Sequence, residues 1–458
     1  MVSLYVYDIA FLVLFTLAVV IFLYTRKSNL KREGILYLYR TSIGLKFIEW
    51  TSKKFPKTLK ALQYVVILSG YTLMILVVWL IGKLGYDYIT SPYLAEAVKV
   101  PVILPLIPYL PELFNLDFLP PFYFTYWIVI IAIIAIPHEF AHGIFARLNK
   151  IRIKSTGFGF LGPFLAAFVE QDEKDMVKAK KFPQLSLLAA GTFANVLTAI
   201  FFAILLWIFF ITAFVPAGVN FNTYATSVLP ASDVELPSDL QLDKELIEIT
   251  YQGQTYFANP ALIQQTLDNE LTHLFAFDNS PAYQAQLKGS ITTFNGVPVT
   301  SFQELSEEIG KYSPGDSVTI TTELENENPI SYDLELAERD GQTFLGTRVI
   351  PPSSKGIMGT LYSWVSEIKD PLTYYKSSLG DFGIFIYDLL WWTILISISV
   401  ALINMLPLGI FDGGRFFLLT IWGLTGSQKI GEKAFKISTI LILLLIAAMM
   451  VKWVTIFF

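Results

Sequence analysis

Two of the three histidines in this 458-residue chain lie four positions apart, with a glutamate between them. They are His138 and His142, in the sequence P-H-E-F-A-H. Residues four apart share one face of a helix, so both imidazoles can reach one zinc ion while Glu139 stands beside the water that the ion polarises. The spacing therefore predicts a zinc-dependent hydrolytic site with Glu139 as its general base and acid. The alternative is a helix end whose polar side chains reach toward the aqueous interface.

A catalytic zinc usually has three protein ligands and one position open to water. The chain has no cysteine, and the remaining histidine, His273, lies in an acidic segment where an ordinary surface or core side chain is the simpler interpretation. A carboxylate is therefore expected as the third ligand. Asp412 is the candidate, because Pro407 and the glycine pair after Asp412 interrupt an apolar helix and let the backbone turn. An aspartate that caps a helix in a D-G-G turn is the alternative.

The elements that must carry these residues are apolar. Hydrophobic residues make up 54% of the chain and charged residues 16%, against about 25% charged in an ordinary soluble domain. About 20 apolar residues are needed to cross a bilayer as a helix. Six segments meet this requirement, near residues 5–24, 62–84, 122–148, 183–215, 382–405 and 437–454.

Charge is distributed unevenly along the chain. Residues 26–60 contain ten Lys and Arg and two Glu, which marks a cytoplasmic connection under the positive-inside rule and puts the N-terminus outside. Residues 221–360 contain 20 acidic and 6 basic residues, so the charge of this block is −14. The net charge of the whole chain is −5, and the charge of the remaining residues is therefore +9. The acidic block is predicted to be a solvated domain outside the cell, and the metal site to lie near the cytoplasmic leaflet.

A hairpin is predicted between the third and fourth spans. Residues 155–170 alternate glycine with phenylalanine, and Gly157, Gly159 and Gly162 rule out a stable helix there. A free strand edge can pair with an unwound peptide through backbone hydrogen bonds, without demanding a particular side-chain sequence. An ordinary loop of glycine and aromatic residues is the alternative.

The fourth span contains one polar residue among small ones. Gly191, Asn195 and Ala199 fall on one helical face, and small residues at this spacing allow close approach of another helix. Asn195 could donate to a substrate carbonyl or to a developing oxyanion. A hydrogen bond that joins two helices is the alternative.

Together, H-E-F-A-H and the later N-x-x-P-x-x-x-x-D-G-G-R resemble the site-2 protease family of intramembrane zinc metalloproteases. The resemblance implies one zinc ion per chain on His138, His142 and Asp412, a hairpin that re-enters the membrane near the metal, and an asparagine near the active site at Asn195. Asn404, which opens the second motif, is a further candidate for substrate binding. Two positions depart from the family pattern: Gly409 stands where a proline is usual, and Phe411 stands where a leucine is usual.

The acidic block also resembles a known module. Residues 279–299, the sequence P-G-D at 314–316 and the alternating segment 317–321 look like the PDZ-type domain that many site-2 proteases carry. Residues 231–278 interrupt this pattern and are interpreted as an insertion. The resemblance implies either a peptide ligand bound by strand addition or a size filter above the membrane site.

The predicted fold is an α-helical polytopic membrane protein of about six transmembrane helices, with a membrane-reentrant β-hairpin and an inserted extracytoplasmic α+β PDZ-like domain. Residues 1–120 are predicted to contain two spans, a basic loop and a proline-rich external segment. Residues 121–216 and 358–458 are predicted to form the two halves of a protease core, and residues 217–357 to form the PDZ-like domain. The resemblance implies a zinc endopeptidase in an archaeal or bacterial cell membrane. Its substrates would be transmembrane proteins or peptides, in regulated proteolysis or signal-peptide clearance, and no nucleic acid partner is expected. The alternatives are a metal-ion transporter and a catalytically silent peptide-binding scaffold.

Overall fold

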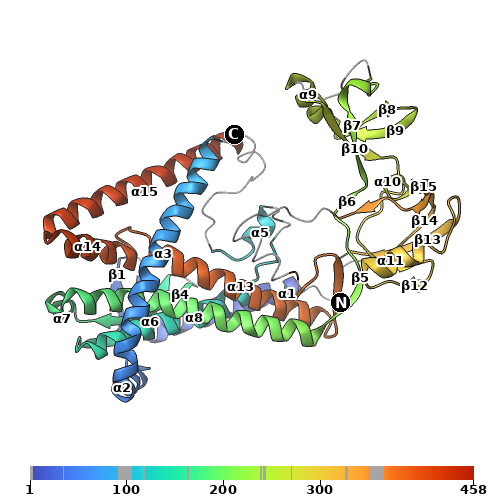
Figure 1. Cartoon of the computed structure of the whole chain (residues 1–458). Coiled ribbons are helices and arrows are strands. Elements are labelled where there is room, and N and C mark those ends of the chain that lie inside the picture. The colour runs from blue at the N-terminus through green and yellow to red at the C-terminus, as the bar shows by residue number, and fades with distance from the viewer. Residues whose placement is uncertain are drawn as a thin grey trace. The chain divides into compact units, whose positions relative to one another are not determined.

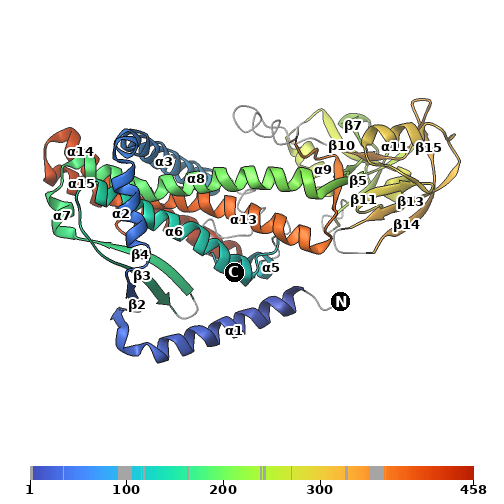
Figure 2. The ribbon, with the colours of Figure 1, turned by 90° about the horizontal axis from the view of Figure 1, so that it is seen from below.

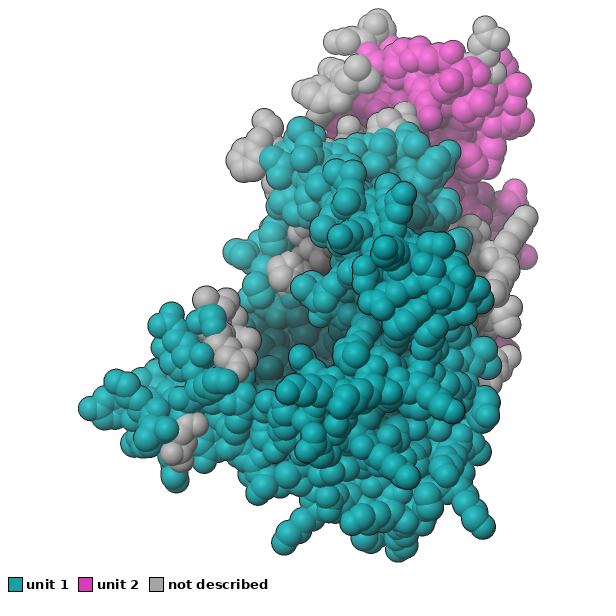
Figure 3. Space-filling model, turned by 90° about the vertical axis from the view of Figure 1, so that its left-hand side faces the viewer, with its two compact units in different colours: residues 1–208, 385–458 teal, residues 209–384 magenta. Residues whose placement is uncertain are grey.

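The computed structural model describes residues 4–34, 36–90, 106–114, 116, 119–161, 164–237, 240, 244–269, 271–324, 328–349, 366 and 368–457. It divides into two compact units, residues 1–208 with 385–458 and residues 209–384, which Figure 3 colours separately. They are called the membrane unit and the inserted unit below. Three predicted features lie outside the described residues: residues 91–105 of the proline-rich segment, Gly162 of the hairpin, and the domain boundary at 357.

The membrane unit is built on six helices that are long and apolar enough to cross a membrane by length and composition. They confirm the six predicted spans, and α6, α8 and α13 run side by side in both ribbon views (Figures 1 and 2). The helices are α1 (Leu4–Thr25), α3 (Pro56–Thr90), α6 (Phe124–Leu148), α8 (Lys181–Ala213), α13 (Asp381–Asn404) and α15 (Gln428–Phe457). The shorter helices of this unit are α2 (Leu45–Lys54), α5 (Leu110–Leu113), α7 (Glu173–Lys178) and α14 (Asp412–Thr425).

The helices approach closely where small residues allow it. A side chain at Gly70 of α3 would lie 2.8 Å from Cβ of Ala189 on α8 and 3.1 Å from the ring of Phe416 on α14. Ala189 and Phe416 are fully buried there. Because lipid tails are as apolar as these side chains, such close packing, rather than a hydrophobic driving force, holds membrane helices together.

A carboxylate on α1 fixes the start of α6. Asp8 is buried and accepts hydrogen bonds from the backbone N–H groups of Phe124 (2.8 Å) and Thr125 (2.9 Å) and from the hydroxyls of Thr125 and Tyr109. The first N–H groups of a helix have no partner within the helix, and a negative charge is favourable there. Asp8 therefore caps α6 from a different helix and fastens α1 to it.

The predicted hairpin is present as β3 (Ile153–Leu161) and β4 (Phe164–Gln171). It belongs to a four-stranded antiparallel sheet in the order β1-β2-β3-β4. The first two strands, β1 (Leu30–Glu33) and β2 (Leu36–Thr41), lie in the basic segment that was predicted to be a loop. Gly157 is needed in this sheet, because a side chain there would overlap the carbonyl of Tyr39 on β2 and the ring of Phe168 on β4. Gly159 has no such constraint.

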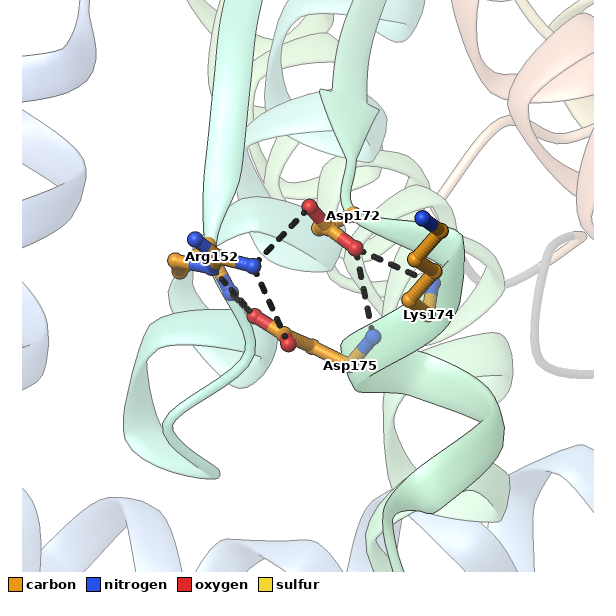
Figure 4. A network of polar contacts seen from close by, with 4 residues as sticks. All are labelled: Arg152, Asp172, Lys174 and Asp175. Carbon is orange, nitrogen blue, oxygen red and sulfur yellow. Dashed lines mark hydrogen bonds and ion pairs between the residues drawn. The ribbon is translucent and has the colours of Figure 1, made fainter.

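Ion pairs fix the base of the hairpin (Figure 4). Nε of Arg152, just before β3, lies 2.7 Å from Oδ2 of Asp175 on α7, and Nη2 lies 3.3 Å from Oδ2 of Asp172. Asp172 also caps α7 by accepting from the N–H groups of Lys174 and Asp175. The hydrogen bond from Arg152 lowers the pKa of Asp175, so both groups stay charged at neutral pH.

The inserted unit contains two larger antiparallel sheets. One has the order β14-β13-β11-β5-β18 with β12 beside β11, and its core includes Val219, Ile291, Phe294, Leu305 and Ile320. The other has the order β7-β10-β9-β8 with helix α9, and it has a core of its own that includes Ile249, Ile263 and Ala276. This sheet and helix contain the segment 231–278, which was interpreted as an insertion, together with β7 just before it.

The elements of this unit are β5 (Phe214–Val219), β6 (Thr223–Tyr224), β7 (Thr226–Pro230), β8 (Ile247–Tyr251), β9 (Gln254–Ala258), α9 (Pro260–Asp268), β10 (His273–Asp278), α10 (Pro281–Gln284), β11 (Ser290–Phe294), β12 (Val297–Pro298), α11 (Phe302–Ile309), β13 (Ser317–Glu323), β14 (Ile330–Glu335), β15 (Ala337–Arg339), β16 (Gln342–Phe344), β17 (Thr347–Arg348) and β18 (Thr373–Ser377).

Candidate metal centre

Three predicted ligands come together in the membrane unit. Nε2 of His138 and Nε2 of His142 are 3.1 Å apart. Oδ2 of Asp412 lies 3.2 Å from Nε2 of His142 and 3.7 Å from Nε2 of His138. The two imidazoles are buried and the aspartate is half-buried. Helix α6 thus supplies two of the ligand atoms, and α14 the third.

The spacing of these atoms fits zinc. Tetrahedral coordination with bonds of about 2.1 Å separates ligand atoms by about 3.4 Å, and the three observed separations lie on both sides of that value. Two imidazoles and one carboxylate are also the donor set of many catalytic zinc sites. The residues present can therefore hold one zinc ion and leave a fourth position open.

Contacts from α8 orient both imidazoles. Nδ1 of His142 lies 2.7 Å from the carbonyl oxygen of Leu187. A carbonyl can only accept, so Nδ1 carries the proton and Nε2 keeps its lone pair. The side-chain amide of Asn195 lies 3.0 Å from Nδ1 of His138. The two orientations of an amide have the same shape, and the one that turns Oδ1 toward Nδ1 gives His138 the same tautomer.

Gly191 lies between these two contacts on α8. A Cβ atom at this position would lie 2.6 Å from Nε2 of His138 and closer still to Nε2 of His142. No side chain, however small, fits there without displacing a ligand. Leu187, Gly191 and Asn195 are spaced four apart, so one face of α8 both orients the imidazoles and leaves room for an ion.

Asp412 owes its position to the tight turn between α13 and α14. A side chain at Gly413 would overlap the backbone of Met405, and one at Gly414 would overlap the backbone of Leu408. These two glycines let the turn after α13 fold back against the start of α14. Phe411 is the N-cap residue of α14, with no side-chain capping bond. Asp412 is therefore not the capping residue of its helix. Its carboxylate faces the two histidines instead.

Glu139 is held by the hairpin. Its Oε2 accepts a hydrogen bond of 2.9 Å from the backbone N–H of Val169 on β4. In the antiparallel ladder Val169 lies opposite Thr156, and its N–H is turned away from β3. Because N–H direction alternates along a strand, Leu165 and Ala167 present their N–H groups to the same side. No other strand among the described residues pairs with this side of β4.

A cavity of about 780 Å³ joins these groups. His138, Glu139, His142 and Asp412 line it. Its other lining residues include the apolar Ile131, Ile134, Ala135, Ile396 and Val400 and the polar Glu170, Gln171, Glu173 and Arg415. Such a cavity suits an extended peptide with apolar side chains and a polar flank.

The remaining predicted residues lie in different surroundings. Asn404 is half-buried and lines the cavity, and its amide has no hydrogen-bond partner among the described residues. Asn195 is fully buried and does not line the cavity. His273 is exposed on β10 of the inserted unit, next to Thr272. Gly157 and Gly159 lie within β3.

Two functional contacts were missed because they are made by the backbone. The carbonyl of Leu187 and the N–H of Val169 touch a predicted ligand and the predicted base. Every residue type carries these groups, so the sequence holds no signal for Val169. For Leu187, its position four residues before Gly191 and eight before Asn195 was the only available hint.

The comparisons with known proteins agree with this geometry. The chain is 29% identical to the zinc metalloprotease RasP of Shouchella clausii (strain KSM-K16) over an alignment of 207 residues, which covers 38% of this chain and 49% of that protein. The chain thus spans about half the length of this curated relative. A model of peptidase family M50 matches residues 126–448, well over half of the chain. The three ligand atoms and Glu139 all fall within that match, and the protein belongs to peptidase family M50, which confirms its resemblance to the site-2 proteases.

Proposed function

We propose that the protein is an intramembrane zinc endopeptidase that hydrolyses peptide bonds within or near transmembrane segments. The observation that carries this proposal is the set of three converging ligand atoms, with Glu139 lining the same cavity, on helices apolar enough to lie in a membrane. An ionisable cluster at such a place is expensive unless it is used. One zinc ion per chain, on His138, His142 and Asp412, is part of the proposal.

When bound, zinc lowers the pKa of a coordinated water to about 7 and polarises a carbonyl. Glu139 takes the proton of the attacking water and returns it to the leaving amine. The hydrogen bond from Val169 keeps its carboxylate facing the cavity.

The substrate is proposed to bind as an added strand along β4. A helical peptide bond is already hydrogen-bonded and shielded, so the substrate must unwind before it can be cut. The outward N–H groups of Leu165 and Ala167 would bind its backbone, in register with Glu139 next to Val169. The free amide of Asn404 is the candidate donor to the substrate carbonyl or oxyanion. Re-entry of this hairpin into the membrane belongs to the same proposal.

Asn195 is proposed to position His138, and not to touch substrate. Its complete burial and its contact of 3.0 Å with Nδ1 of His138 support this role. Partners of this kind fix the tautomer of a metal-bound histidine and typically change metal affinity by about 10- to 100-fold.

The inserted unit is proposed to be extracytoplasmic and to include a PDZ-like module built on β5, β11, β13 and β14 with helices α10 and α11. Its acidity and the basic segment between α1 and α3 support this topology in a bacterial or archaeal cell membrane. A labelled peptide that ends in a free carboxylate, titrated against the full protein in nanodiscs, tests for a peptide ligand.

The test of the main proposal compares wild type with Glu139→Gln in proteoliposomes that contain a model transmembrane substrate. We expect wild type to cleave the substrate, and Glu139→Gln to lose about a hundred- to ten-thousandfold in rate while keeping its zinc. Glu432→Gln on α15 is the matched control and should behave as wild type. Equal cleavage by wild type and Glu139→Gln contradicts the proposed mechanism. Zinc flux into the proteoliposomes without cleavage would support a transporter. Zinc-independent peptide binding without cleavage would support a scaffold.

A further inference from the structure

Helix α2 exposes large apolar side chains that no described residue covers. Phe47 is 51% exposed, Trp50 50%, Phe55 43% and Ile43, just before the helix, 65%. The rings of Phe47, Trp50 and Phe55 follow one another at centroid distances of 6.1 and 5.8 Å. These four residues are called the α2 face below, and its three aromatic rings form a continuous ridge. An exposed apolar surface of this kind marks a place where something other than water is bound.

The same helix is strongly basic. Lys46, Lys53 and Lys54 lie on it and are exposed, and Lys57 and Lys60 follow at the start of α3. The ammonium of Lys54 lies 4.6 Å from the centroid of the Trp50 ring.

Carboxylates do not neutralise this charge. The single acidic residue of α2, Glu49, lies 3.2 Å from Arg147 and 3.9 Å from Lys53. Among the described residues, the ammonium groups of the other lysines have no ion pair with a carboxylate. The surplus charge of the helix is therefore positive and available to an anion.

The opposite side of α2 is fastened to the helix that carries the metal ligands. Ile48 is fully buried, and its Cδ1 would lie 2.8 Å from a Cβ atom added at Gly143 on α6. At the start of α2, Gly44 adopts φ +85° and passes directly beneath the ring of Phe140. Phe140 follows Glu139, so the docked side of α2 touches the turn of α6 that holds the proposed base. The two helices are therefore closely packed at this turn.

The position of α2 along the chain places it at a membrane boundary. It ends at Lys54, and α3, an apolar helix of 35 residues, begins at Pro56, directly beside it in Figure 1. A short helix with aromatic and lysine side chains on its outer face, joined to the end of a spanning helix, has the pattern of an interfacial helix. Aromatic rings favour the level of the lipid headgroups, and lysines favour their phosphates.

We propose that α2 lies in the membrane interface on the basic side of the protein, with the α2 face in the acyl boundary and Lys46, Lys53 and Lys54 bound to the headgroups of anionic phospholipids. Charge complementarity selects this occupant, because an apolar ridge flanked by lysines, of which among the described residues only Lys53 has an ion pair with a carboxylate, fits a negatively charged leaflet and not a neutral one. Through Ile48 and Phe140, this lipid site fixes the depth at which α6 holds its polar turn. The proposal depends only on the protein being in a membrane, and not on its proteolytic activity.

Lipid retention tests the charge of this site. The full protein is incorporated into vesicles of phosphatidylcholine with about one-third phosphatidylglycerol, extracted in mild detergent, and its bound lipids are counted by mass spectrometry. We expect wild type to retain phosphatidylglycerol preferentially, and the triple variant Lys46→Gln, Lys53→Gln, Lys54→Gln to lose most of that preference. The matched control changes three exposed lysines of α15, at positions 429, 433 and 436, to Gln. Equal loss in both triple variants, or no loss in either, overturns the proposal.

A depth measurement tests insertion. The chain contains no cysteine, so Ile43→Cys gives a single site for an environment-sensitive fluorophore, and Asp340→Cys in the inserted unit gives a control site. Lipids brominated on their acyl chains should quench the label at position 43 and leave that at position 340 unchanged. A label at position 43 that is unquenched overturns the proposal, because the face is then in water or covered by protein.

Discussion

The two walls of the cavity are built in different ways. On one side, helices α6 and α14 present the ligand atoms, and α8 orients the two imidazoles, His142 through the carbonyl of Leu187 and His138 through Asn195. On the other side, strand β4 lines the cavity with Glu170 and Gln171, and the outward backbone N–H groups of this strand pair with no other strand among the described residues. One wall is closed by internal contacts, and the other keeps an open edge.

This difference corresponds to two tasks. A metal site needs its ligand atoms held in place, because the ion is bound only where all of them converge. An edge strand must accept many sequences, and backbone groups are the same in all of them. Only the contact between Val169 and Glu139 joins the two walls through a predicted catalytic group. Mutations in the helix wall should therefore affect zinc, and mutations in the strand wall should affect substrate.

The largest effect is expected from Gly191→Ala. The added methyl group would lie 2.6 Å from Nε2 of His138, in the space where the ligand atoms converge. Zinc content should fall from about one ion per chain to less than about a tenth, and cleavage should be lost with it. Metal analysis of the purified variant measures this directly.

Gly423→Ala on α14 is the control for this change, because nothing lies within 4 Å of a side chain at that position. It should keep its zinc, and the better helix propensity of alanine should leave the fold intact. A Gly191→Ala variant that binds zinc normally would show that α8 does not form the helix wall as described.

A smaller effect is expected from changes at Asn195, and it separates two roles. Asn195→Leu removes the partner of Nδ1 of His138 and should weaken zinc binding about 10- to 100-fold in competition with a chelator. Asn195→Asp keeps an acceptor for that nitrogen, so it should restore most of the zinc affinity. If Asn195 instead donated to an oxyanion, both variants would bind zinc normally and both would lose rate.

Much of the helix wall could be predicted because its information is local. Two histidines four apart define a helical ligand pair, and an apolar run of about 20 residues defines a span, whatever the rest of the fold does. Asp412 followed by elimination, since the chain has no cysteine and only one other histidine. Gly191 was recognised as a small residue on a contact face, while the reason for its size became clear only with both imidazoles beside it.

The strand wall could be predicted only in part. The glycine and phenylalanine pattern predicted β3 and β4, which are close in sequence, but β2 pairs with β3 across more than 110 residues. The tyrosines and the threonine of β2 favour a strand, but nothing in the sequence indicates a partner so far along the chain. Helix α14 was missed for another reason: it has 14 residues, too few to span a membrane, and its start is hidden in the D-G-G turn.

A test of the strand wall uses two prolines. Ala167 turns its N–H to the open side of β4, whereas the N–H of Ala166 is turned to β3, opposite Gly159. Proline is tolerated in an edge strand where the lost N–H faces outward. Ala167→Pro should therefore keep zinc and thermal stability but lower kcat/KM about tenfold, because one backbone hydrogen bond to the substrate is gone.

The matched variant, Ala166→Pro, removes a hydrogen bond inside the sheet. It should lower the thermal stability of the protein and reduce cleavage for that reason. Unchanged kcat/KM in Ala167→Pro would rule out substrate pairing along β4 and leave the strand only its contact with Glu139.

The smallest effect is expected at the base of the hairpin, at the ion pairs of Arg152. Because the hydrogen bond from Arg152 lowers the pKa of Asp175, the charged pair stabilises the folded protein at pH values above the ordinary aspartate pKa of about 4. This contribution is lost as the pH falls through the lowered value. Asp175→Asn should lower Tm at pH 7 by on the order of 1 °C, and the difference from wild type should vanish in stronger acid. Asp340→Asn, at a side chain that is 93% exposed, is the control. A difference that persists unchanged at low pH would mean that Asp175 acts through packing and not through its charge.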